Sequence, residues 1–359
     1  MNDTHRRDLI VPGEAAGERD ARRDPGEDRI ISELIALNGG DPATPEGRCV
    51  RDLLHASARL LKDGRDLWEL RLISSAVKEL RYAMRVFSRF AEPHKVTIFG
   101  SARTPESDPD FTACVEFSRL MAQAGWMVIT GAGDGIMKAG HVGPGRDASF
   151  GVAIRLPFET SANSVISGDE KLINFRYFFT RKLMFMSQCE AVALFPGGFG
   201  TMDEAFEALT LIQTGKATMV PVVMLAGAGS DYWEDWMRWL RRSLLDRKFI
   251  GPEDLNLFKV CQTPRDAAEH IAAFYSVYHS SRYFGDTFVI RLSRTLPEAH
   301  LARLNEEFSA LVKTGSIAQS ATGDEEDDFP HLPRLSFHHT RNRFGLVRRL
   351  IDRINESPA

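Results

Sequence analysis

The spacing of apolar residues changes several times along the chain. Residues 1–28 combine many Arg, Asp, Glu and Gly residues with few large apolar side chains, and they are predicted to form a flexible tail. From Arg29 to about Phe90, apolar residues recur three and four positions apart, which places them on one face of a helix. Residues 29–92 are therefore predicted to form a helical extension that packs against another part of the protein.

After Pro93, short apolar runs alternate with amphipathic segments. The runs are apolar throughout, which is typical of parallel strands covered on both faces. This alternation predicts an α/β fold over residues 93–281, a Rossmann-like, doubly wound parallel sheet. The predicted strands are 95–100, 126–130, 150–157, 191–196, 219–225 and 257–260, and the predicted helices are 111–125, 174–188, 202–213, 232–247 and 264–279, with a further helix after the loop at 131–135.

The rhythm changes again after Arg282. The pattern predicts strands at 286–293 and 333–339, helices at 297–315 and 343–355, and an acidic loop at 323–328. Residues 282–359 are therefore predicted to form a small C-terminal α+β appendage. No internal repeat with a fixed period is visible, which argues against a solenoid.

Composition narrows the classes of function. Lys and Arg number 45 against 49 Asp and Glu, so the net charge is −4 and nucleic acid is not an expected partner. A membrane partner is not expected either, because no apolar run approaches the roughly 18 residues of a membrane helix. The first residues lack the apolar core of a secretory signal. The four cysteines lie far apart, which predicts neither a disulfide framework nor structural zinc and favours a cytoplasmic location.

Two glycine-rich loops, Gly131–Gly135 and Gly197–Thr201, each follow an apolar strand and begin a helix. Backbone N–H groups at a helix N-terminus can bind an anion. Glycines in a tight turn can also be purely geometric, but two such loops favour a nucleoside monophosphate or a similar anion as the ligand. A Walker A loop is excluded because Ala217 follows Lys216. The glycine spacing also departs from the dinucleotide fingerprint, which leaves a nicotinamide cofactor only as an alternative.

Charged residues near the second loop allow two interpretations each. Thr201 and Glu204 have the T-x-x-E spacing of a capping box, in which both side chains satisfy backbone donors. In the functional interpretation, Thr201 extends the phosphate cradle and Glu204 faces a bound sugar. Arg181 and Lys182 lie within a strongly apolar helix, where they form either an internal ion pair or an anion-binding pair.

The run PGGFGTMDE (196–204), together with TRK (180–182), resembles the Lonely Guy family of cytokinin-activating phosphoribohydrolases, whose hallmark is PGGxGTxxE after an Arg-Lys pair. GSAR, TGAGDGIM, LPFETSAN and LTLIQTGK extend the similarity over residues 95–280 and resemble the longer bacterial subgroup. The resemblance implies hydrolysis of the N-glycosidic bond of a nucleoside 5′-monophosphate, AMP or an N6-modified AMP, to free base and ribose 5-phosphate. It implies no cofactor or metal. Some members are labelled lysine decarboxylases, yet nothing in the sequence indicates a pyridoxal phosphate site.

The resemblance also implies roles for individual residues. Arg181 and Glu204 fall on the family's catalytic pair. A glycine of the first loop is replaced by Ala132, which narrows the room for a ligand that approaches the backbone. Family members usually form homodimers or higher homo-oligomers. The implied phosphate- and nucleotide-binding residues are Gly198, Phe199, Gly200, Thr201, Met202, Asp203, Lys182, Thr210, Asn163, Gly131 and Gly133.

Two alternatives to a simple hydrolase stay open. Proteins that resemble molybdenum-cofactor carriers have similar loops and hold a phosphorylated ligand without cleaving it. The helical extension and the appendage could also form an effector site or an oligomer interface around an enzymatic core.

Overall fold

The computed structural model describes residues 24–155, 162–321 and 329–358. Most of the predicted tail, residues 156–161 of the LPFETSAN motif and the predicted acidic loop at 323–328 lie outside the described residues. Contacts divide the chain between Arg81 and Tyr82 into two units, and each unit is described by itself. The predicted boundaries at 92/93 and 281/282 stay predictions.

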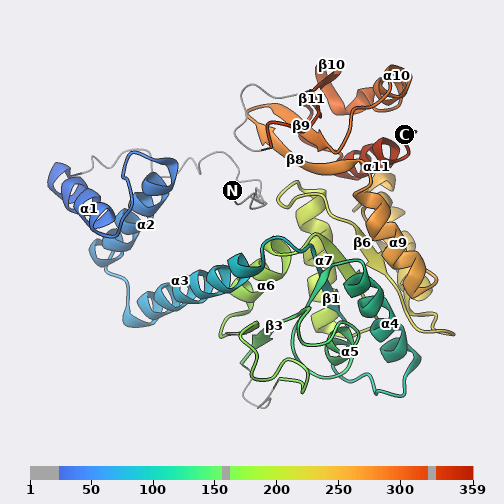
Figure 1. The fold of residues 1–359 in the computed structure, drawn as a ribbon, viewed down its shortest axis with the longest axis horizontal. Helices are drawn as coiled ribbons and strands as arrows, with labels where there is room; N and C mark the ends of the chain where they lie inside the picture. Colours follow the sequence, from blue (N-terminus) through green and yellow to red (C-terminus); the bar gives the residue numbers. More distant parts are fainter. Residues whose placement is uncertain (1–23, 156–161, 322–328, 359) are drawn as a thin grey trace. The chain divides into compact units, whose positions relative to one another are not determined.

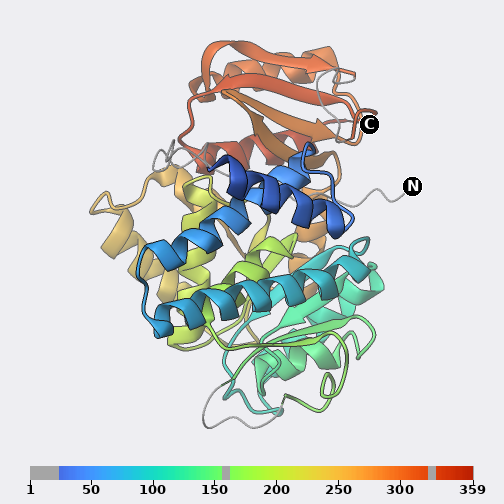
Figure 2. The ribbon, with the colours of Figure 1, turned by 90° about the vertical axis from the view of Figure 1, so that its left-hand side faces the viewer.

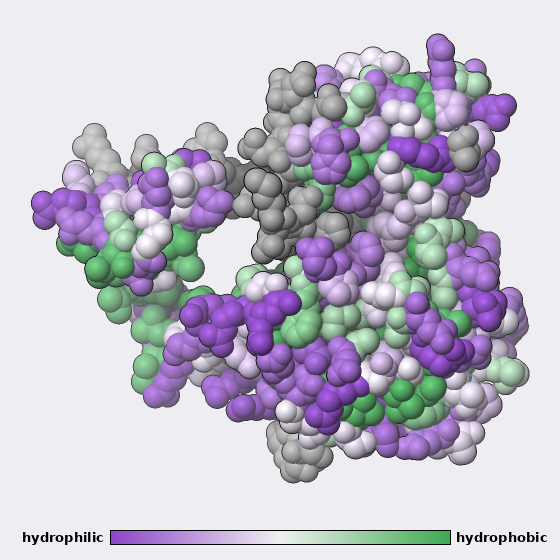
Figure 3. Space-filling view, in the orientation of Figure 1, coloured by the Kyte–Doolittle hydropathy of each residue, from purple (hydrophilic) through white to green (hydrophobic). Residues whose placement is uncertain are grey.

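The N-terminal region is helical, as predicted: residues 24–92 contain α1 (Pro25–Leu37), α2 (Pro45–Lys62) and α3 (Leu67–Phe87), of which α3 crosses the boundary between the units. His55 of α2 is buried and its Nε2 lies 2.7 Å from the carboxylate of Asp28 in α1, so a hydrogen bond joins these two helices. Apolar side chains also remain on the surface of the α1–α2 pair (Figure 3), including Leu37 and Leu61.

The central sheet is parallel. Its strands, within the described residues, are β1 (Lys95–Phe99), β2 (Met127–Thr130), β3 (Ser149–Ile154), β4 (Leu172–Phe175), β5 (Ala191–Leu194), β6 (Val222–Met224) and β7 (Lys259–Val260). They are ordered β4-β3-β2-β1-β5-β6-β7. The chain starts in the middle with β1, runs outward to β4, and then returns to the other side of β1. The predicted doubly wound α/β fold is thereby confirmed.

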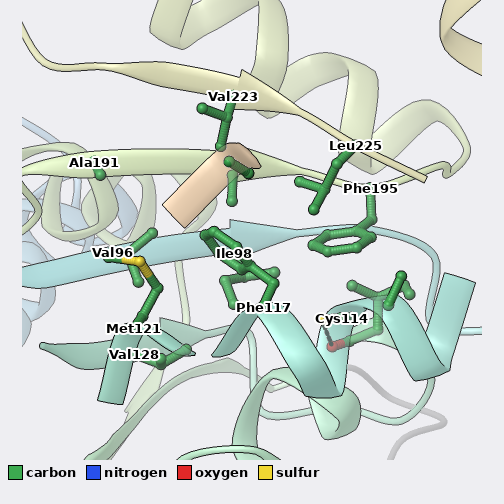
Figure 4. Close-up of a cluster of buried hydrophobic side chains, with 14 of the residues drawn as sticks. Val96, Ile98, Cys114, Phe117, Met121, Val128, Ala191, Phe195, Val223 and Leu225 are labelled. Atoms are coloured by element: carbon green, nitrogen blue, oxygen red, sulfur yellow. Dashed lines mark hydrogen bonds between the residues drawn. The ribbon is translucent and has the colours of Figure 1, made fainter. Parts of the chain in front are cut away.

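Helices cover both faces of this sheet (Figure 1). They are α4 (Pro109–Gln123), α5 (Ile136–Val142), α6 (Phe178–Ser187), α7 (Phe199–Gln213), α8 (Tyr232–Leu240) and α9 (Pro264–Phe274). Figure 4 shows Phe117 and Met121 of α4 beside Val96 and Ile98 of β1, in a core that also includes Ile271 of α9.

The opposite face of β1 packs against α6. The ring of Phe99 lies 4.9 Å from that of Phe185, and the hydroxyl of Thr97 donates to the Phe185 carbonyl. Alternate residues of a strand point to opposite faces, so Thr97 and Phe99 face α6 while Val96 and Ile98 face α4. The sheet is therefore buried on both sides, as the continuous apolar runs predicted.

The C-terminal region contains an antiparallel sheet, drawn orange to red in Figures 1 and 2. Its described strands have the order β10-β11-β9-β8, and α10 (Glu298–Glu307) and α11 (Phe344–Asn355) accompany them. The predicted α+β appendage is confirmed as a fold. The strand bounds are β8 (Tyr278–Phe284), β9 (Thr287–Leu292), β10 (Val312–Ser320) and β11 (Arg334–His339).

Three predicted helices are too long at one end. The segment 174–188 begins with the end of β4, the segment 264–279 ends in the first residues of β8, and the segment 297–315 runs into β10. In each case the extra residues pair with a neighbouring strand, and such long-range pairing overrides local helical spacing. The segment 232–247 forms α8 only to Leu240, followed by a π-helical turn.

Candidate functional site

A cavity of about 770 Å³ opens at the carboxyl ends of β1, β2 and β5. The strand order reverses between β1 and β5, and doubly wound sheets bind ligands in the crevice at this point. The cavity wall is formed by the turn Gly100–Arg103 after β1, Gly131 after β2, the segment Gly197–Glu204 after β5, and side chains of α5 and α6. Both glycine-rich loops therefore reach the same site, the first through Gly131.

The second glycine loop presents the N-terminus of α7 to this cavity. The helix begins at Phe199 after the N-cap residue Gly198, and no side chain among the described residues caps it. Phe199 is 97% exposed, and Gly198 and Gly200 are exposed as well. The first N–H groups of a helix have no partner within the helix, so this end of α7 is suited to bind an anion.

The capping-box interpretation of Thr201 and Glu204 is wrong. Because α7 starts at Phe199, Thr201 is its third residue and Glu204 lies in its second turn, too far along to cap it. Thr201 instead packs beside Gly197, where an added Cβ would lie 2.1 Å from its hydroxyl oxygen. The side chain of Glu204 is 12% exposed and lines the cavity.

Lys182 of α6 connects to three carboxylates of α7. Its Nζ lies 2.7 Å from Asp203 Oδ2 and 2.6 Å from Glu207 Oε2. The same Nζ lies 3.8 Å from Glu204 Oε2, which is an ion-pair distance but not a hydrogen bond. The side chain of Lys182 is 14% exposed, so this cation bridges two helices in a mostly buried position.

The carboxyl group of Glu204 has an unusual pKa. Burial raises the pKa of Glu204 to about 7, while Lys182 and Arg181 act to lower it. Glu207 and Asp203 add smaller raising contributions. Burial acts to lower the pKa of Lys182. Its hydrogen bonds with Asp203 and Glu207, together with the charges of Glu204 and Glu207, outweigh burial and raise the pKa. Glu204 therefore titrates near neutral pH, as general acids and bases do.

Arg181 is held in place from several sides. Its Nε donates to the carbonyl of Val152 at 2.9 Å, and its guanidinium lies 5.1 Å from the ring centre of Phe185. At Gly131 an added Cβ would lie 2.4 Å from Arg181 Nη2, so only glycine leaves room for the guanidinium. Arg181 lines the cavity in this fixed position.

Backbone groups of the first glycine loop form hydrogen bonds with neighbouring residues. Ala132 has a φ of +64°, in the left-handed region, and its N–H donates to the Thr130 hydroxyl. Asn163 is buried; its amide donates to the Gly133 carbonyl at 3.0 Å, and its N–H donates to the Ala132 carbonyl. The short helix α5 that follows has seven residues. Asn163 thus braces the loop from inside the protein.

The structure brings together most of the residues singled out from the sequence. Lys182 contacts Glu204 but does not line the cavity. Asn163 and Gly133 are hydrogen-bonded to each other and do not line it either. Thr210 is exposed in the last turns of α7. Ligand contacts by these four residues stay predictions. The residues that line the cavity are Arg181, Glu204, Gly131, Gly198, Phe199, Gly200, Thr201, Met202 and Asp203.

Sequence reasoning missed the turn Gly100–Arg103 and the side chains of Met137 and Phe178, which also line the cavity. The turn follows β1 and donates from Ser101 N to the carbonyl of Pro196, so it lies directly beside the second glycine loop. Arg103 is exposed, and the described residues provide no ion pair for it. The position of this turn, directly after the first predicted strand, could have identified it as part of the site, because ligands bind at the carboxyl ends of parallel strands.

Two other kinds of site were sought in the described parts of the chain. They contain no group of three or more His, Cys, Asp or Glu residues that could hold a metal ion. Within the same ranges, no helix has both the length and the apolar character that crossing a membrane requires.

Residues 132–271 match the model of a protein family described as "Possible lysine decarboxylase". Similar solved structures include TM1055, a structural genomics target (23% identity over 50% of this chain and 98% of that chain, TM-score 0.36). Others are a molybdenum cofactor carrier protein from Chlamydomonas reinhardtii (18%, 50% and 97%, TM-score 0.35) and a molybdenum cofactor binding protein from Rippkaea orientalis (18%, 50% and 96%, TM-score 0.35). No curated protein matches the chain.

Proposed function

We propose that this chain, whose residues 132–271 carry the Lonely Guy-family domain, hydrolyses the N-glycosidic bond of a nucleoside 5′-monophosphate to free base and ribose 5-phosphate. The substrate is AMP or an N6-modified AMP. A single observation carries the proposal: a mostly buried carboxylate, Glu204, lines the same cavity as the uncapped N-terminus of α7. An anion site and an ionisable acid are thus separated by one turn of a helix.

The 5′-phosphate binds at the start of α7, where the backbone N–H groups of Gly200 and Thr201 and the cation of Arg103 complement its charge. This remote contact fixes the ribose against Glu204 and contributes binding energy to the reacting centre. Arg181, which is held by Val152, anchors the sugar or phosphate and helps to position Glu204.

Cleavage proceeds through an oxocarbenium-like state of the ribose. The electron pair of the C1′–N bond leaves with the base, which takes up a proton. The oxygen of a water molecule bonds to C1′ and the water gives up a proton, which balances the proton taken up by the base, and the product is ribose 5-phosphate. The ionised carboxylate of Glu204 stabilises the developing positive charge and orients the water. A pKa of about 7 leaves a substantial part of Glu204 ionised at neutral pH.

The alternative function is non-catalytic binding of a nucleotide or another phosphorylated cofactor. Such a protein needs the phosphate site at α7 but has no need of a mostly buried acid beside it. The low exposure of Glu204 therefore favours hydrolysis. Lysine decarboxylation is disfavoured, because Lys182 is bound to Asp203 and Glu207 and its raised pKa makes it a poor nucleophile for a Schiff base.

The test compares wild type, Glu204→Gln and Glu207→Gln on a panel of nucleoside monophosphates, with released base measured by chromatography. Glu204→Gln is expected to lose at least about 100-fold in turnover, as single electrostatic groups commonly do, and to keep its affinity for the nucleotide. Glu207→Gln, one turn further along α7, is the matched control and is expected to lose only a few-fold.

Two results would count against the proposal. Near-normal turnover by Glu204→Gln would remove Glu204 from the reaction. Tight nucleotide binding by the wild type without release of base from any monophosphate would favour the carrier alternative.

We also infer from the family resemblance that the protein is a cytoplasmic homodimer or higher homo-oligomer, without a nucleic-acid or membrane partner.

A further inference from the structure

We propose that Lys182 is a positioning residue that keeps Glu204 ionised and oriented, and that it does not contact the substrate. This inference rests on the proposed function, because it assigns a role to Lys182 in the action of Glu204. It also gives the two residues of the Arg-Lys pair different roles: Arg181 contacts the ligand, and Lys182 positions Glu204. The sequence alone did not separate these roles.

The contacts of Lys182 leave its ammonium group little capacity for a ligand. An ammonium has three hydrogen-bond donors. Hydrogen bonds to Asp203 and Glu207 occupy two of them, and the ammonium points toward Glu204 at 3.8 Å. Lys182 is absent from the cavity wall, whereas Glu204 belongs to it. The ammonium group of Lys182 therefore affects a ligand in the cavity only through its contact with Glu204.

Arg181 points elsewhere. Successive residues of a helix point about 100° apart, so the side chains of Arg181 and Lys182 leave α6 in different directions. The guanidinium of Arg181 lies against Gly131 and donates to Val152 of β3, on the cavity side of α6. Arg181 is thus placed to touch a ligand, while Lys182 is placed to touch the acids of α7.

The charge around Glu204 explains why a cation is needed. Asp203 and Glu207 stand on the same helix, and both disfavour the ionised form of Glu204, as does burial. Opposing them are Lys182 and Arg181 from α6, and Arg103 from the turn after β1 lines the same cavity. Without Lys182, three carboxylates would share this corner of the fold. Nearby like charges and burial both favour the protonated acid.

The direction of the pH effect follows from this balance. Glu204 acts as a carboxylate, so activity is lost as the pH falls through its pKa. Removing Lys182 raises that pKa, and the loss of activity then begins at a higher pH. At a fixed pH below the pKa, raising the pKa of Glu204 by one lowers its ionised fraction about tenfold.

The first experiment measures kcat/KM against pH for wild type, Lys182→Met and Lys182→Arg. In Lys182→Met the acid limb is expected to move up by at least one pH unit. Because wild-type Glu204 is about half ionised at pH 7, activity there falls by about fivefold or more and recovers near pH 9. Lys182→Arg keeps the cation and is expected to stay within about threefold of wild type. A loss that is equal at every pH would overturn the proposal, because a merely structural role predicts that result.

Lys171→Met is the matched control. Lys171 is also buried and pairs with a carboxylate, that of Asp169 at 2.7 Å, but it lies outside the cavity wall. This variant is expected to lose stability without moving the acid limb. If Lys182→Met does not fold, Lys182→Gln replaces it: its neutral amide can still donate to Asp203 or Glu207, and the acid limb is expected to move up as in Lys182→Met.

A second readout separates this inference from the proposed function. Carboxyl carbons of glutamate are labelled with ¹³C, the Glu204 signal is assigned by its absence in Glu204→Gln, and the signal is titrated without substrate. A midpoint at least one pH unit higher in Lys182→Met supports the inference even if the wild type hydrolyses no nucleotide. An unchanged midpoint refutes it even if the wild type is a hydrolase.

Discussion

The two glycine-rich loops follow equivalent strands and look alike in sequence, yet their glycines serve opposite needs. In the first loop, an added Cβ at Gly131 or Gly135 would overlap atoms of Arg181 or of the turn after β1. In the second, added Cβ atoms at Gly198 and Gly200 would meet no described atom within 4 Å. Protein atoms therefore fill the space beside these glycines of the first loop. The second loop is open at Gly198 and Gly200, although its first glycine, Gly197, packs against Thr201.

This difference shows how a glycine can be required for two physical reasons. In the first loop the glycines allow close packing inside the protein, which places Arg181 and the turn Gly100–Arg103. In the second loop packing requires glycine at Gly197 but not at Gly198 or Gly200. At these two positions, space for an approaching anion is a reason for glycine. The comparison therefore indicates a scaffolding role for the first loop, and it supports the proposal that the second loop binds the phosphate.

Gly135→Ala gives the largest expected effect on this comparison. The residue has a φ of +60°, and an added Cβ would lie 2.3 Å from the carbonyl oxygen of Ser101, a backbone atom that cannot swing away. Left-handed strain costs about 1–2 kcal/mol, and the overlap adds to it. We expect the free energy of unfolding to fall by about 3 kcal/mol or more in urea titrations. A loss below about 1 kcal/mol would mean that the loop and the turn move apart readily.

Gly200→Ala is expected to separate stability from binding. Gly200 is the second residue of α7, where alanine has the higher helix propensity by about 0.5–1 kcal/mol. The free energy of unfolding is therefore expected to stay equal or rise. The methyl group narrows the open approach to the helix N-terminus, so KM for a nucleoside monophosphate is expected to rise about tenfold, which corresponds to about 1.4 kcal/mol.

The control for Gly200→Ala is a ligand without phosphate. Affinity for the corresponding nucleoside, measured by calorimetry, is expected to be unchanged by the substitution. Equal losses for nucleoside and nucleotide would place the methyl group against the sugar or base, and no loss for either would remove the second loop from phosphate binding.

The doubly wound sheet could be predicted from the sequence because most of its strands are largely apolar and alternate with amphipathic helices. The strands β4, β8 and β10 were missed where a helical spacing continued into residues that pair across the sheet, and such pairing depends on distant parts of the chain. Glu204 could be identified through the family resemblance, but its role was ambiguous, since the T-x-x-E spacing also fits a cap. Only the start of α7 at Phe199 excludes that interpretation.

The different contacts of Arg181 and Lys182 could not be predicted from the sequence, for a similar reason. Adjacent residues of a helix point in different directions, and their partners come from β3 and α7, which are distant in sequence. The same holds for Asn163, whose bonds to Gly133 and Ala132 appear only when the chain has folded.

Ala132→Gly gives the smallest expected effect and tests the scaffolding role directly. Relief of the left-handed strain at φ +64° contributes about 1–2 kcal/mol. Loss of a buried methyl group and the greater freedom of glycine in the unfolded chain together offset roughly that amount. We therefore expect the free energy of unfolding to change by less than about 1 kcal/mol. KM for the nucleotide is also expected to be unchanged, because the proposed phosphate site lies at the start of α7. If the added room instead lowered KM several-fold, the first loop would be a binding loop as well, and the contrast between the two loops would fail.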